Sequence, residues 1–477
     1  MKKIFLLITV LFILSVPINA YAEDAAQKLD AALIAGSGAG TESLKDSNIS
    51  TYNKFSAGQS LTIRVGENQS IGGIYLKWYM VPGAWSLRYT DGGGNTSSLD
   101  CGRNGFLHEY VSIEDGGIRE CVMEFSSEAV LCDVYVYSPG KLPDDVQVWQ
   151  PPVDKADILV FSTHADDECL FLGGVLATYA GGQDLKVQVV YMTTYWDILI
   201  VREHEKLNGL WTMGVKNYPV NGFTPDEYVT TVEAAAKLYG KDKWTEFITE
   251  QIRRFKPQIV VSQDFNGEYG HVAHILKAEC IQEAVENSMN ADFWPASASQ
   301  YGTWDVPKTY YHLYWENQIH LDLRQPISAL GGKTAVETAA AAYLCHESQQ
   351  WCWFYVTDDP NDPKADKINC AEFGLYRTTV GADTGNDMME HIVSYKEQDR
   401  IAEEARLAEE ARLAEEKKAK EEEEAKLKHD AETAAAEIEA GLAAEKKKLS
   451  AGGVAAGILM ALMLGAGVMV YAGDKRR

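Results

Sequence analysis

The segment Ile158–Glu168 reads ILVFSTHADDE, and it decides the fold of the central part of this 477-residue chain. Its first five residues form a continuous apolar run, which is typical of a parallel strand buried on both faces. A helical pattern follows to about Tyr179, and residues 187–192 form a second strand pattern. Strand and helix patterns alternate in this way to about Tyr395, so we expect an α/β domain over residues 154–395.

Charged side chains stand directly after that first strand, in the segment HADDE at positions 164–168. Sheets with parallel strands place their functional sites at the carboxyl ends of the strands. Three acids and one histidine within five positions would be costly in a core, and no structural role requires them. The segment therefore indicates that a cation compensates the charge of Asp166, Asp167 and Glu168.

A second polar cluster, Asp264–His274, follows a strand pattern at 258–262 and reads DFNGEYGHVAH. His271 and His274 are three positions apart at the start of a helical pattern, so they share one helix face. Two histidines and one carboxylate form a common catalytic zinc site that leaves one position open for water. The zinc motif HExxH is absent, and an HxxH pair alone is a weak signal. Together with HADDE, in the matching place after a strand, the pair predicts one metal site built from both clusters.

HADDE followed by YGHVAH resembles the motifs of the PIG-L/LmbE-like family of N-acetylglucosaminyl de-N-acetylases, which are HPDDE and HxDH or HxxH. The resemblance covers residues 154–395. It includes Arg202 and Glu205 in an R-x-x-E segment, and the stretch 342–349, AYLCHESQ, which is similar to the family pattern A-x-x-x-H-x-S-Q. Members of this family are zinc-dependent hydrolases with a Rossmann-like fold, and the resemblance implies the same for this domain.

The family pattern implies a role for each polar residue of the two motifs. His164, Asp167 and His274 would hold the metal, and Asp166 would be the general base that takes a proton from water. His271 would stabilise the oxyanion or protonate the departing amine. Zinc (Zn2+) is the expected ion, although another divalent metal such as iron or cobalt also suits these ligands.

Two further residues are assigned by the resemblance, and two depart from it. Tyr269 stands where some members place a tyrosine that polarises the substrate carbonyl, and Arg202 stands where some members contact substrate. Ala165 replaces the usual proline, which removes no ligand. Ala273 replaces the aspartate that many members carry before the last histidine, so we expect a supporting hydrogen bond to the metal ligand to be missing.

The region before the α/β domain has a different pattern. Residues 23–45 are small and polar, and we expect an irregular lead-in there. Short β-rich runs separated by turn clusters lie between Ser60 and Tyr137, which predicts an antiparallel β-sandwich within residues 23–150. With its aromatic residues and the segment Asp46–Tyr52, this region weakly resembles a discoidin-type, galactose-binding-like domain, which implies that it binds carbohydrate. The alternative is that the aromatic residues only form the core of the sandwich.

Both ends of the chain carry apolar segments. Residues 1–22 have the layout of a secretory signal peptide, and a retained N-terminal anchor is the alternative. Residues 454–472 are long and apolar enough for a transmembrane helix, and the basic tail 473–477 places that end in the cytoplasm. These features predict a single-pass type I protein of the cell membrane with an extracellular ectodomain.

Residues 396–450 are low in complexity and repeat the hexad EEARLA. Ala, Glu, Lys, Leu and Arg favour helix, and a step of six residues places Leu407 and Leu413 about 120° apart, so no apolar stripe forms. We expect a solvated helical stalk that is stabilised by Glu–Arg and Glu–Lys pairs. A coiled coil through which chains self-associate is the alternative.

The formal net charge is −25, and such a surface repels phosphate backbones. Nucleic acid and anionic lipid are therefore poor partners for the ectodomain, and a neutral or cationic ligand fits better. All eight cysteines lie in the part predicted to be exported, where an even number permits disulfides, although the sequence does not give their pairing.

Two functions agree with these patterns. The first is a cell-surface hydrolase that uses one divalent metal to remove the acetyl group from an N-acetylglucosamine-type sugar or glycoconjugate. The second is a non-catalytic adhesin that binds glycans on a stalk. Asp166 and His271 favour the hydrolase, because binding alone requires neither of them.

Overall fold

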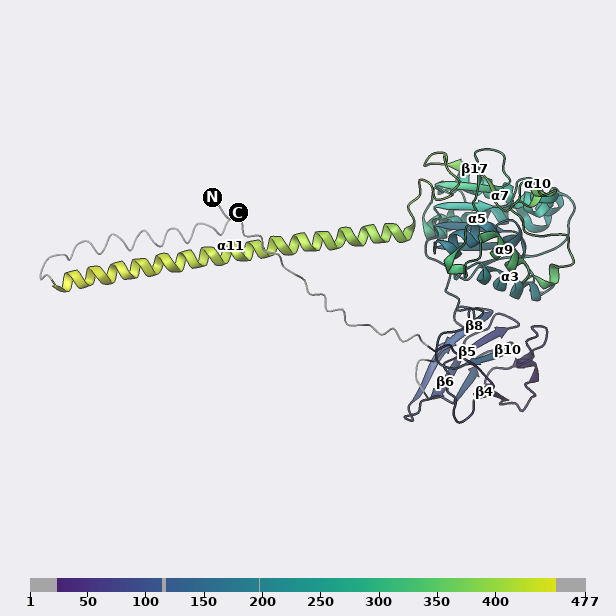
Figure 1. Ribbon diagram of the computed structural model, residues 1–477, viewed down its shortest axis with the longest axis horizontal. Helices are drawn as coiled ribbons and strands as arrows, with labels where there is room; N and C mark the ends of the chain where they lie inside the picture. Colours follow the sequence, from purple (N-terminus) through teal and green to yellow (C-terminus); the bar gives the residue numbers. More distant parts are fainter. Residues whose placement is uncertain (1–23, 114–116, 197, 452–477) are drawn as a thin grey trace. The chain divides into compact units, whose positions relative to one another are not determined.

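The computed structural model of the chain describes residues 24–113, 117–196 and 198–451. The chain divides into two compact units after Glu397 (Figure 1). The first unit contains a β-sandwich followed by an α/β domain, and the described residues of the second unit belong to one long helix.

The β-sandwich consists of two antiparallel sheets of five strands each. In the first sheet β10 pairs with β1, β3 and β5, and β5 also pairs with β8. The second sheet has the order β2-β4-β9-β6-β7. The strands are β1 (Lys28–Leu29), β2 (Ala32–Ala35), β3 (Asn53–Phe55), β4 (Ser60–Arg64), β5 (Gly73–Trp78), β6 (Trp85–Thr90), β7 (Thr96–Cys101), β8 (His108–Ser112), β9 (Glu120–Phe125) and β10 (Ala129–Tyr137). Alternate residues of β6, namely Trp85, Leu87 and Tyr89, are buried against Trp78 and Phe125, so the core lies between the sheets.

The expectation of an irregular lead-in at residues 23–45 is wrong. This segment contains β1, β2 and the 3-10 helix η1 (Glu42–Leu44). β2 pairs with β4 and buries Leu33 and Ala35, while Ala32 and Ile34 face outward. Two of the four residues are alanines, which carry a weak apolar signal, and therefore the alternation of a half-buried strand is hard to detect in the sequence.

A seven-stranded sheet forms the centre of the α/β domain, in the order β13-β12-β11-β14-β15-β17-β16. Neighbouring strands from β13 to β15 are parallel, whereas β17 is antiparallel to both β15 and β16. The strands are β11 (Ile158–Ser162), β12 (Val187–Thr194), β13 (Val220–Pro225), β14 (Ile259–Ser262), β15 (Lys308–His312), β16 (Gln318–His320) and β17 (Glu372–Thr378). The strand order reverses between β11 and β14, and open α/β sheets bind their ligands beyond the carboxyl ends of the strands at such a point.

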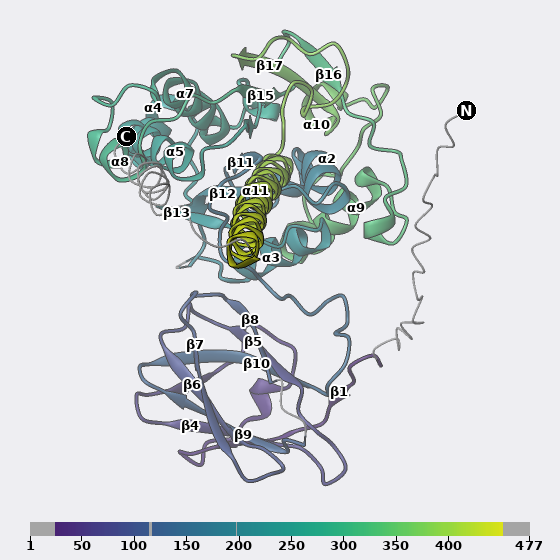
Figure 2. The same cartoon turned by 90° about the vertical axis from the view of Figure 1, so that its left-hand side faces the viewer.

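Helices cover both faces of this sheet (Figure 2). Ile158 and Val160 of β11 share a core with α3 and α9, whereas Leu159 and Phe161 share a core with α5 and α7. The longer helices of the domain are α3 (Val201–Thr212), α5 (Lys241–Phe255), α7 (Val272–Asn287) and α9 (Ala335–Tyr343). Shorter helical segments are α1 (Asp167–Leu170), α2 (Gly173–Val175), η2 (Leu176–Gly182), α4 (Val232–Ala235), η3 (Ala236–Gly240), α6 (Gly267–Gly270), α8 (Pro295–Tyr301), η4 (Ser328–Leu330), η5 (Glu347–Gln349) and α10 (Ala365–Ile368). The predicted β-sandwich followed by a Rossmann-like α/β domain is confirmed.

The chain continues from Tyr395 as the single helix α11 (Tyr395–Ala451), as the low-complexity sequence predicts (Figure 1). Arg406 forms ion pairs with Glu403 at 2.6 Å and Glu410 at 2.5 Å, which are the pairs expected one turn away on either side. Leu407 and Leu413 are about half exposed. The residues that the structure describes therefore bury no apolar stripe along this helix.

Within residues 24–113, 117–196 and 198–451, the structure contains no helix that is both long and apolar enough to cross a membrane. The predicted signal peptide at 1–22, the transmembrane helix at 454–472 and the basic tail at 473–477 lie outside the described residues. All eight cysteines are free thiols.

Candidate active site

Two loops form the candidate site, and each follows the carboxyl end of one of the neighbouring strands β11 and β14. Oε1 of Gln263, after β14, accepts hydrogen bonds from N and Oγ1 of Thr163, after β11, at 2.9 and 2.8 Å. The buried ammonium of Lys277 in α7 donates to the carbonyl of Phe161 at 2.8 Å, and burial lowers the pKa of this lysine to about 7. Side-chain hydrogen bonds thus hold the two loops next to each other.

The three predicted metal ligands meet at this edge of the sheet. Nδ1 of His164 lies 3.0 Å from Oδ2 of Asp167 and 3.0 Å from Nε2 of His274. The third edge of this ligand triangle, between Nε2 of His274 and Oδ2 of Asp167, is 3.2 Å. Ligand atoms around a tetrahedral zinc ion lie about 3.3 Å apart, because each is about 2.0–2.1 Å from the metal. The spacing therefore fits a divalent cation, which would also offset the cost of burying two ring nitrogens against a carboxylate.

His274 contacts a carboxylate through the ring nitrogen that is not part of the ligand triangle. Its Nδ1 lies 2.6 Å from Oε2 of Glu268, so its Nε2 faces the ligand triangle. Glu268 also contacts Nδ1 of His312 at 3.2 Å, and its backbone has a positive φ of 56°. The expectation that Ala273 leaves the metal ligand without support is therefore wrong, since Glu268 supplies the hydrogen bond from a turn in the same loop.

Asp226, directly after β13, is the corresponding partner of His164. Its Oδ1 lies 3.4 Å from Nε2 of His164, and its Oδ2 accepts a hydrogen bond of 3.1 Å from the hydroxyl of Tyr195. The sequence analysis does not identify Asp226. In the sequence, Asp226 is marked only by its position directly after β13. In the sheet, β12 alone separates β13 from β11.

Asp166 lies beside the ligand triangle but is not part of it. Its Oδ2 is 3.0 Å from Nη2 of Arg202, and Arg202 also donates to the carbonyl of Ala165 and lies over the ring of Tyr195. Burial raises the pKa of Asp166 to about 6, although Arg202 acts in the opposite direction. Arg202, predicted to bind substrate, thus contacts the predicted general base directly.

Two residues that the sequence analysis leaves without a role hold Asp166 in place. The backbone of Asp166 has a φ of 119°, and its N–H donates to Oε2 of Glu168 at 2.8 Å. Oε1 of the same glutamate lies 2.7 Å from Nε2 of His346, which comes from the stretch 342–349. Because L-residues rarely adopt such a φ, this buried Glu168–His346 pair stabilises a conformation that Asp166 would not otherwise favour.

His271 completes the polar groups around the triangle. Its ring centroid is 4.6 Å from those of both His164 and His274, and its ring nitrogen lies close enough to theirs for all three to hold one cation. Nδ1 of His271 is buried and has no hydrogen-bond partner among the described residues. Burial and the neighbouring histidines lower the pKa of His271 to about 3, so its imidazole is neutral at pH 7 and can donate one hydrogen bond.

Tyr269 lies toward the mouth of the site, where 38% of its surface is exposed. Its ring centroid is 5.8 Å from that of His271, 5.1 Å from that of Phe354 and 6.1 Å from that of the partly exposed Trp353. The structure therefore brings all seven predicted site residues together, and it adds an aromatic rim next to Tyr269.

Part of this chain is similar to known proteins. Residues 159–285 match the family model PIG-L, described as GlcNAc-PI de-N-acetylase, so the predicted resemblance to this family is confirmed over these residues. A curated relative is the 1D-myo-inositol 2-acetamido-2-deoxy-alpha-D-glucopyranoside deacetylase 1 of Catenulispora acidiphila. It is 25% identical over 205 residues, which are 38% of this chain and 61% of the relative. The chain thus spans less than two thirds of this relative.

Solved structures similar to this chain fall into two groups. One is represented by the N,N'-diacetylchitobiose deacetylase from Pyrococcus horikoshii, at 18% identity, with 42% of this chain and 73% of that chain covered and a TM-score of 0.31. The other is represented by the family 32 CBM from C. perfringens NanJ in complex with galactose, at 14% identity, with 24% of this chain and 99% of that chain covered and a TM-score of 0.20.

Proposed function

We propose that this chain is a metal-dependent hydrolase that removes the acetyl group from an N-acetylglucosamine-type sugar or glycoconjugate, with zinc as the metal. The observation that carries the proposal is the ligand triangle of His164, Asp167 and His274. A carboxylate, that of Asp166, and a neutral imidazole, that of His271, lie next to it. The match of residues 159–285 to a de-N-acetylase family supports the reaction type.

The residues of the site account for each step of amide hydrolysis. A divalent cation in the triangle would supply a Lewis acid for the amide carbonyl and would make a water more acidic. Asp166 takes the proton of the attacking water as the new C–O bond forms, and Arg202 holds its carboxylate in position. His271 donates a hydrogen bond to the carbonyl oxygen as this becomes negative. The C–N bond then breaks as the proton held by Asp166 passes to the nitrogen, so water and amide give acetate and a free amine.

A sugar is the substrate that fits the surroundings of the triangle. Tyr269, Phe354 and Trp353 place aromatic rings at the mouth of the site, and such rings pack against the apolar faces of sugars while their polar atoms accept or donate hydrogen bonds. Asp226 faces the same site from β13 and provides a carboxylate for a sugar hydroxyl. The net charge of −25 makes nucleic acid a poor substrate.

The test is release of acetate by the full chain, stripped of metal with a chelator and then reloaded with Zn2+. The substrates are N-acetylglucosamine, N,N'-diacetylchitobiose and an N-acetylglucosaminyl-inositol, and the free amine is measured in the same samples. We expect one amine for each acetate, and no release before Zn2+ is added. If the reloaded chain binds Zn2+ and these sugars but releases no acetate, the alternative of a non-catalytic glycan-binding adhesin is supported instead.

We also propose that the enzyme is a single-pass type I protein of the cell membrane with its catalytic domain outside the cell. The support is the composition of residues 1–22 and 454–472, together with the solvent-exposed helix α11 between the catalytic domain and the second segment. Protease treatment of intact cells should release the catalytic domain and leave a small C-terminal fragment in the membrane fraction. Full protection of the domain in intact cells would contradict this location.

A further inference from the structure

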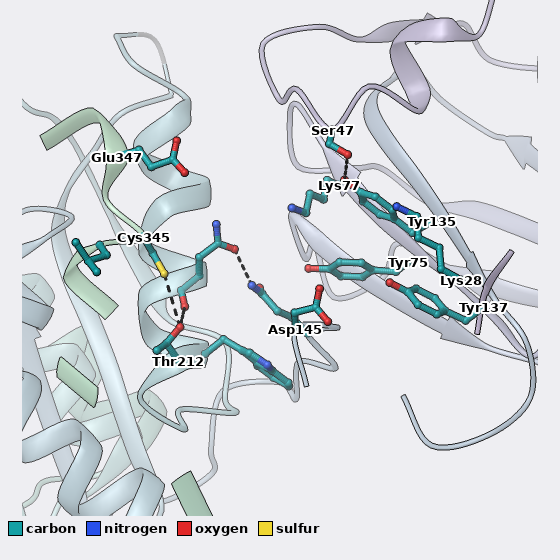
Figure 3. Close-up of a pocket in the computed structure, with 14 residues that line it drawn as sticks. Lys28, Ser47, Tyr75, Lys77, Tyr135, Tyr137, Asp145, Thr212, Cys345 and Glu347 are labelled. Carbon is teal, nitrogen blue, oxygen red and sulfur yellow. Dashed lines mark hydrogen bonds between the residues drawn. The ribbon is translucent and has the colours of Figure 1, made fainter. Parts of the chain in front are cut away.

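A cavity of about 600 Å³ lies between the β-sandwich and the α/β domain, away from the candidate active site (Figure 3). One wall is the outer face of the sheet that contains β10 and β5, and the opposite wall is formed by the C-terminal part of α3 and the residues that follow α9. Arg202 and Trp211, both on α3, are separated by about 14 Å along the helix axis, at 1.5 Å per residue. The cavity, which Trp211 lines, is thus a separate site on the same rigid element.

Direct contacts between the two domains give this cavity a defined shape. Nε2 of His108 lies 2.8 Å from Nδ1 of His204, and the amide of Gln147 donates to Oδ1 of Asn208 at 2.7 Å. The backbone N–H of Leu107 also donates to the hydroxyl of Tyr218 at 3.0 Å. Because these groups are buried or partly buried and are hydrogen-bonded across the boundary, the walls are held together by specific contacts.

Tyrosines cover the sandwich wall of the cavity. Tyr75 of β5 and Tyr135 of β10 are direct partners in the antiparallel register, and their ring centroids lie 5.9 Å apart. Tyr137, two positions further along β10, points to the same face of the sheet. Tyr75 and Tyr137 are largely buried, whereas Tyr135 is partly exposed. The ring face and the hydroxyl of Tyr135 offer the combination that a sugar ring with its C–H faces and hydroxyls requires.

The charged side chains that line the cavity comprise two lysines and two acids. Lys28 and Lys77 place their ammonium groups over the ring of Tyr135, at 4.4 and 5.7 Å from its centroid. Figure 3 shows Glu347 on the opposite wall from Lys77 and Asp145 between the walls. None of these four charged side chains forms an ion pair or a side-chain hydrogen bond with another of the described residues. The two ammonium groups can donate hydrogen bonds and the two carboxylates can accept them, while their charges cancel. Such a lining suits an uncharged ligand that carries many hydroxyl or amide groups.

We propose that this cavity is a second carbohydrate site, which holds an uncharged oligosaccharide between Tyr135 and Lys77 on one wall and Glu347 on the other. Its volume lies within the range of small-molecule sites, and the balanced charges disfavour phosphorylated, sulfated or polycationic ligands. The proposal goes beyond the catalytic function and does not depend on it, since binding at this cavity requires neither Asp166 nor the ligand triangle.

The test is isothermal titration of the full, chelator-treated chain with tetra-N-acetylchitotetraose, which is uncharged, and with its cationic de-N-acetylated form. The variant Tyr135→Ala/Lys77→Met removes a ring and an ammonium from one wall. We expect its affinity for the uncharged tetramer to fall about tenfold or more. The matched control is Arg88→Met/Glu124→Gln, which removes an exposed ion pair of the same sandwich outside the cavity and whose affinity should equal that of the unmodified chain.

A second variant tests the other wall and protects the result against misfolding of the sandwich. Glu347→Gln removes one charge from the cavity and should also weaken binding of the uncharged tetramer. Unchanged affinity in both cavity variants would overturn the proposal, as would binding of the cationic tetramer alone. Acetate release from the monosaccharide N-acetylglucosamine, with Zn2+ restored, should be the same in the cavity variants and the control. A chain that binds the tetramer through this cavity but never releases acetate would refute the proposed catalysis and keep the second site.

Discussion

Replacing Asp166 with Asn removes the proposed general base while preserving most of its surroundings. Asparagine has nearly the same size, tolerates positive φ better than most residues, and can still accept a hydrogen bond from Arg202. It cannot take a proton from water. General acid–base groups contribute about 10²- to 10⁴-fold to rate, which corresponds to about 2.7–5.4 kcal/mol of transition-state stabilisation. We therefore expect kcat for acetate release to fall by this factor.

The same variant should still bind the metal, because no atom of Asp166 belongs to the ligand triangle. The loss of the ionic contact with Arg202 should cost about 1–3 kcal/mol of unfolding free energy, since a weaker hydrogen bond remains in its place. The assay is therefore acetate release at saturating substrate, with zinc content and thermal unfolding measured on the same preparation.

Asp157→Asn is the matched control for this variant. Asp157 is also buried, at the opposite end of β11, where its carboxylate accepts hydrogen bonds from the backbone of Lys186 and Tyr395. This variant should lose stability but keep kcat. If Asp166→Asn retains more than a tenth of the activity with zinc bound, Asp166 is not the general base and the reasoning fails.

Three further results follow from the geometry of the site. Burial raises the pKa of Asp166 to about 6, and a nearby cation lowers this pKa. Because the base must be ionised, kcat should fall as the pH decreases through a midpoint between about 4 and 6. A midpoint above 7 in the pH–rate profile would contradict this. His271→Ala should lower kcat about 10²- to 10³-fold with zinc content unchanged, because a hydrogen bond to the oxyanion is lost. If the variant loses its zinc instead, His271 is a metal ligand and the assigned role is wrong. His346→Ala removes the imidazole partner of a buried Glu168 oxygen, which keeps only the weak hydrogen bond from Sγ of Cys169, and it should cost about 1–3 kcal/mol in chemical denaturation and lower kcat. His320→Ala, at an exposed His–Glu pair, should change neither quantity.

The seven residues that the structure brings together could be predicted to lie at one site because their signals are mostly local in sequence. HADDE and YGHVAH each combine acids or histidines within a few positions of a strand end, and parallel strands bring such ends to one edge of the sheet. The sequence therefore predicts both the proposed metal ligands His164, Asp167 and His274 and the fold that brings them together.

The supporting residues could not be predicted, because their roles depend on the folded chain. Glu268 supports His274 only because its own backbone adopts a positive φ. His346 meets Glu168 across 178 positions of sequence, and no periodicity encodes that contact. Asp226 stands alone after β13, and its place beside His164 follows from the strand order and not from any motif.

The same distinction applies to the fold. Buried strands such as β11 and the repetitive helix α11 have strong patterns of apolar or helix-forming residues, and both were predicted. β1 and β2 are short, and β2 contains two alanines, so burial against β4 and β10 stabilises them more than any local preference does.

The most direct test of the account is an anomalous diffraction map, recorded at the zinc absorption edge, from crystals of the chain grown with Zn2+. We predict one strong peak within about 2.0–2.2 Å of Nδ1 of His164, Oδ2 of Asp167 and Nε2 of His274. The absence of a peak at these three atoms, or a peak at the other cluster of potential ligands formed by Glu168, Cys169 and His346, would contradict it.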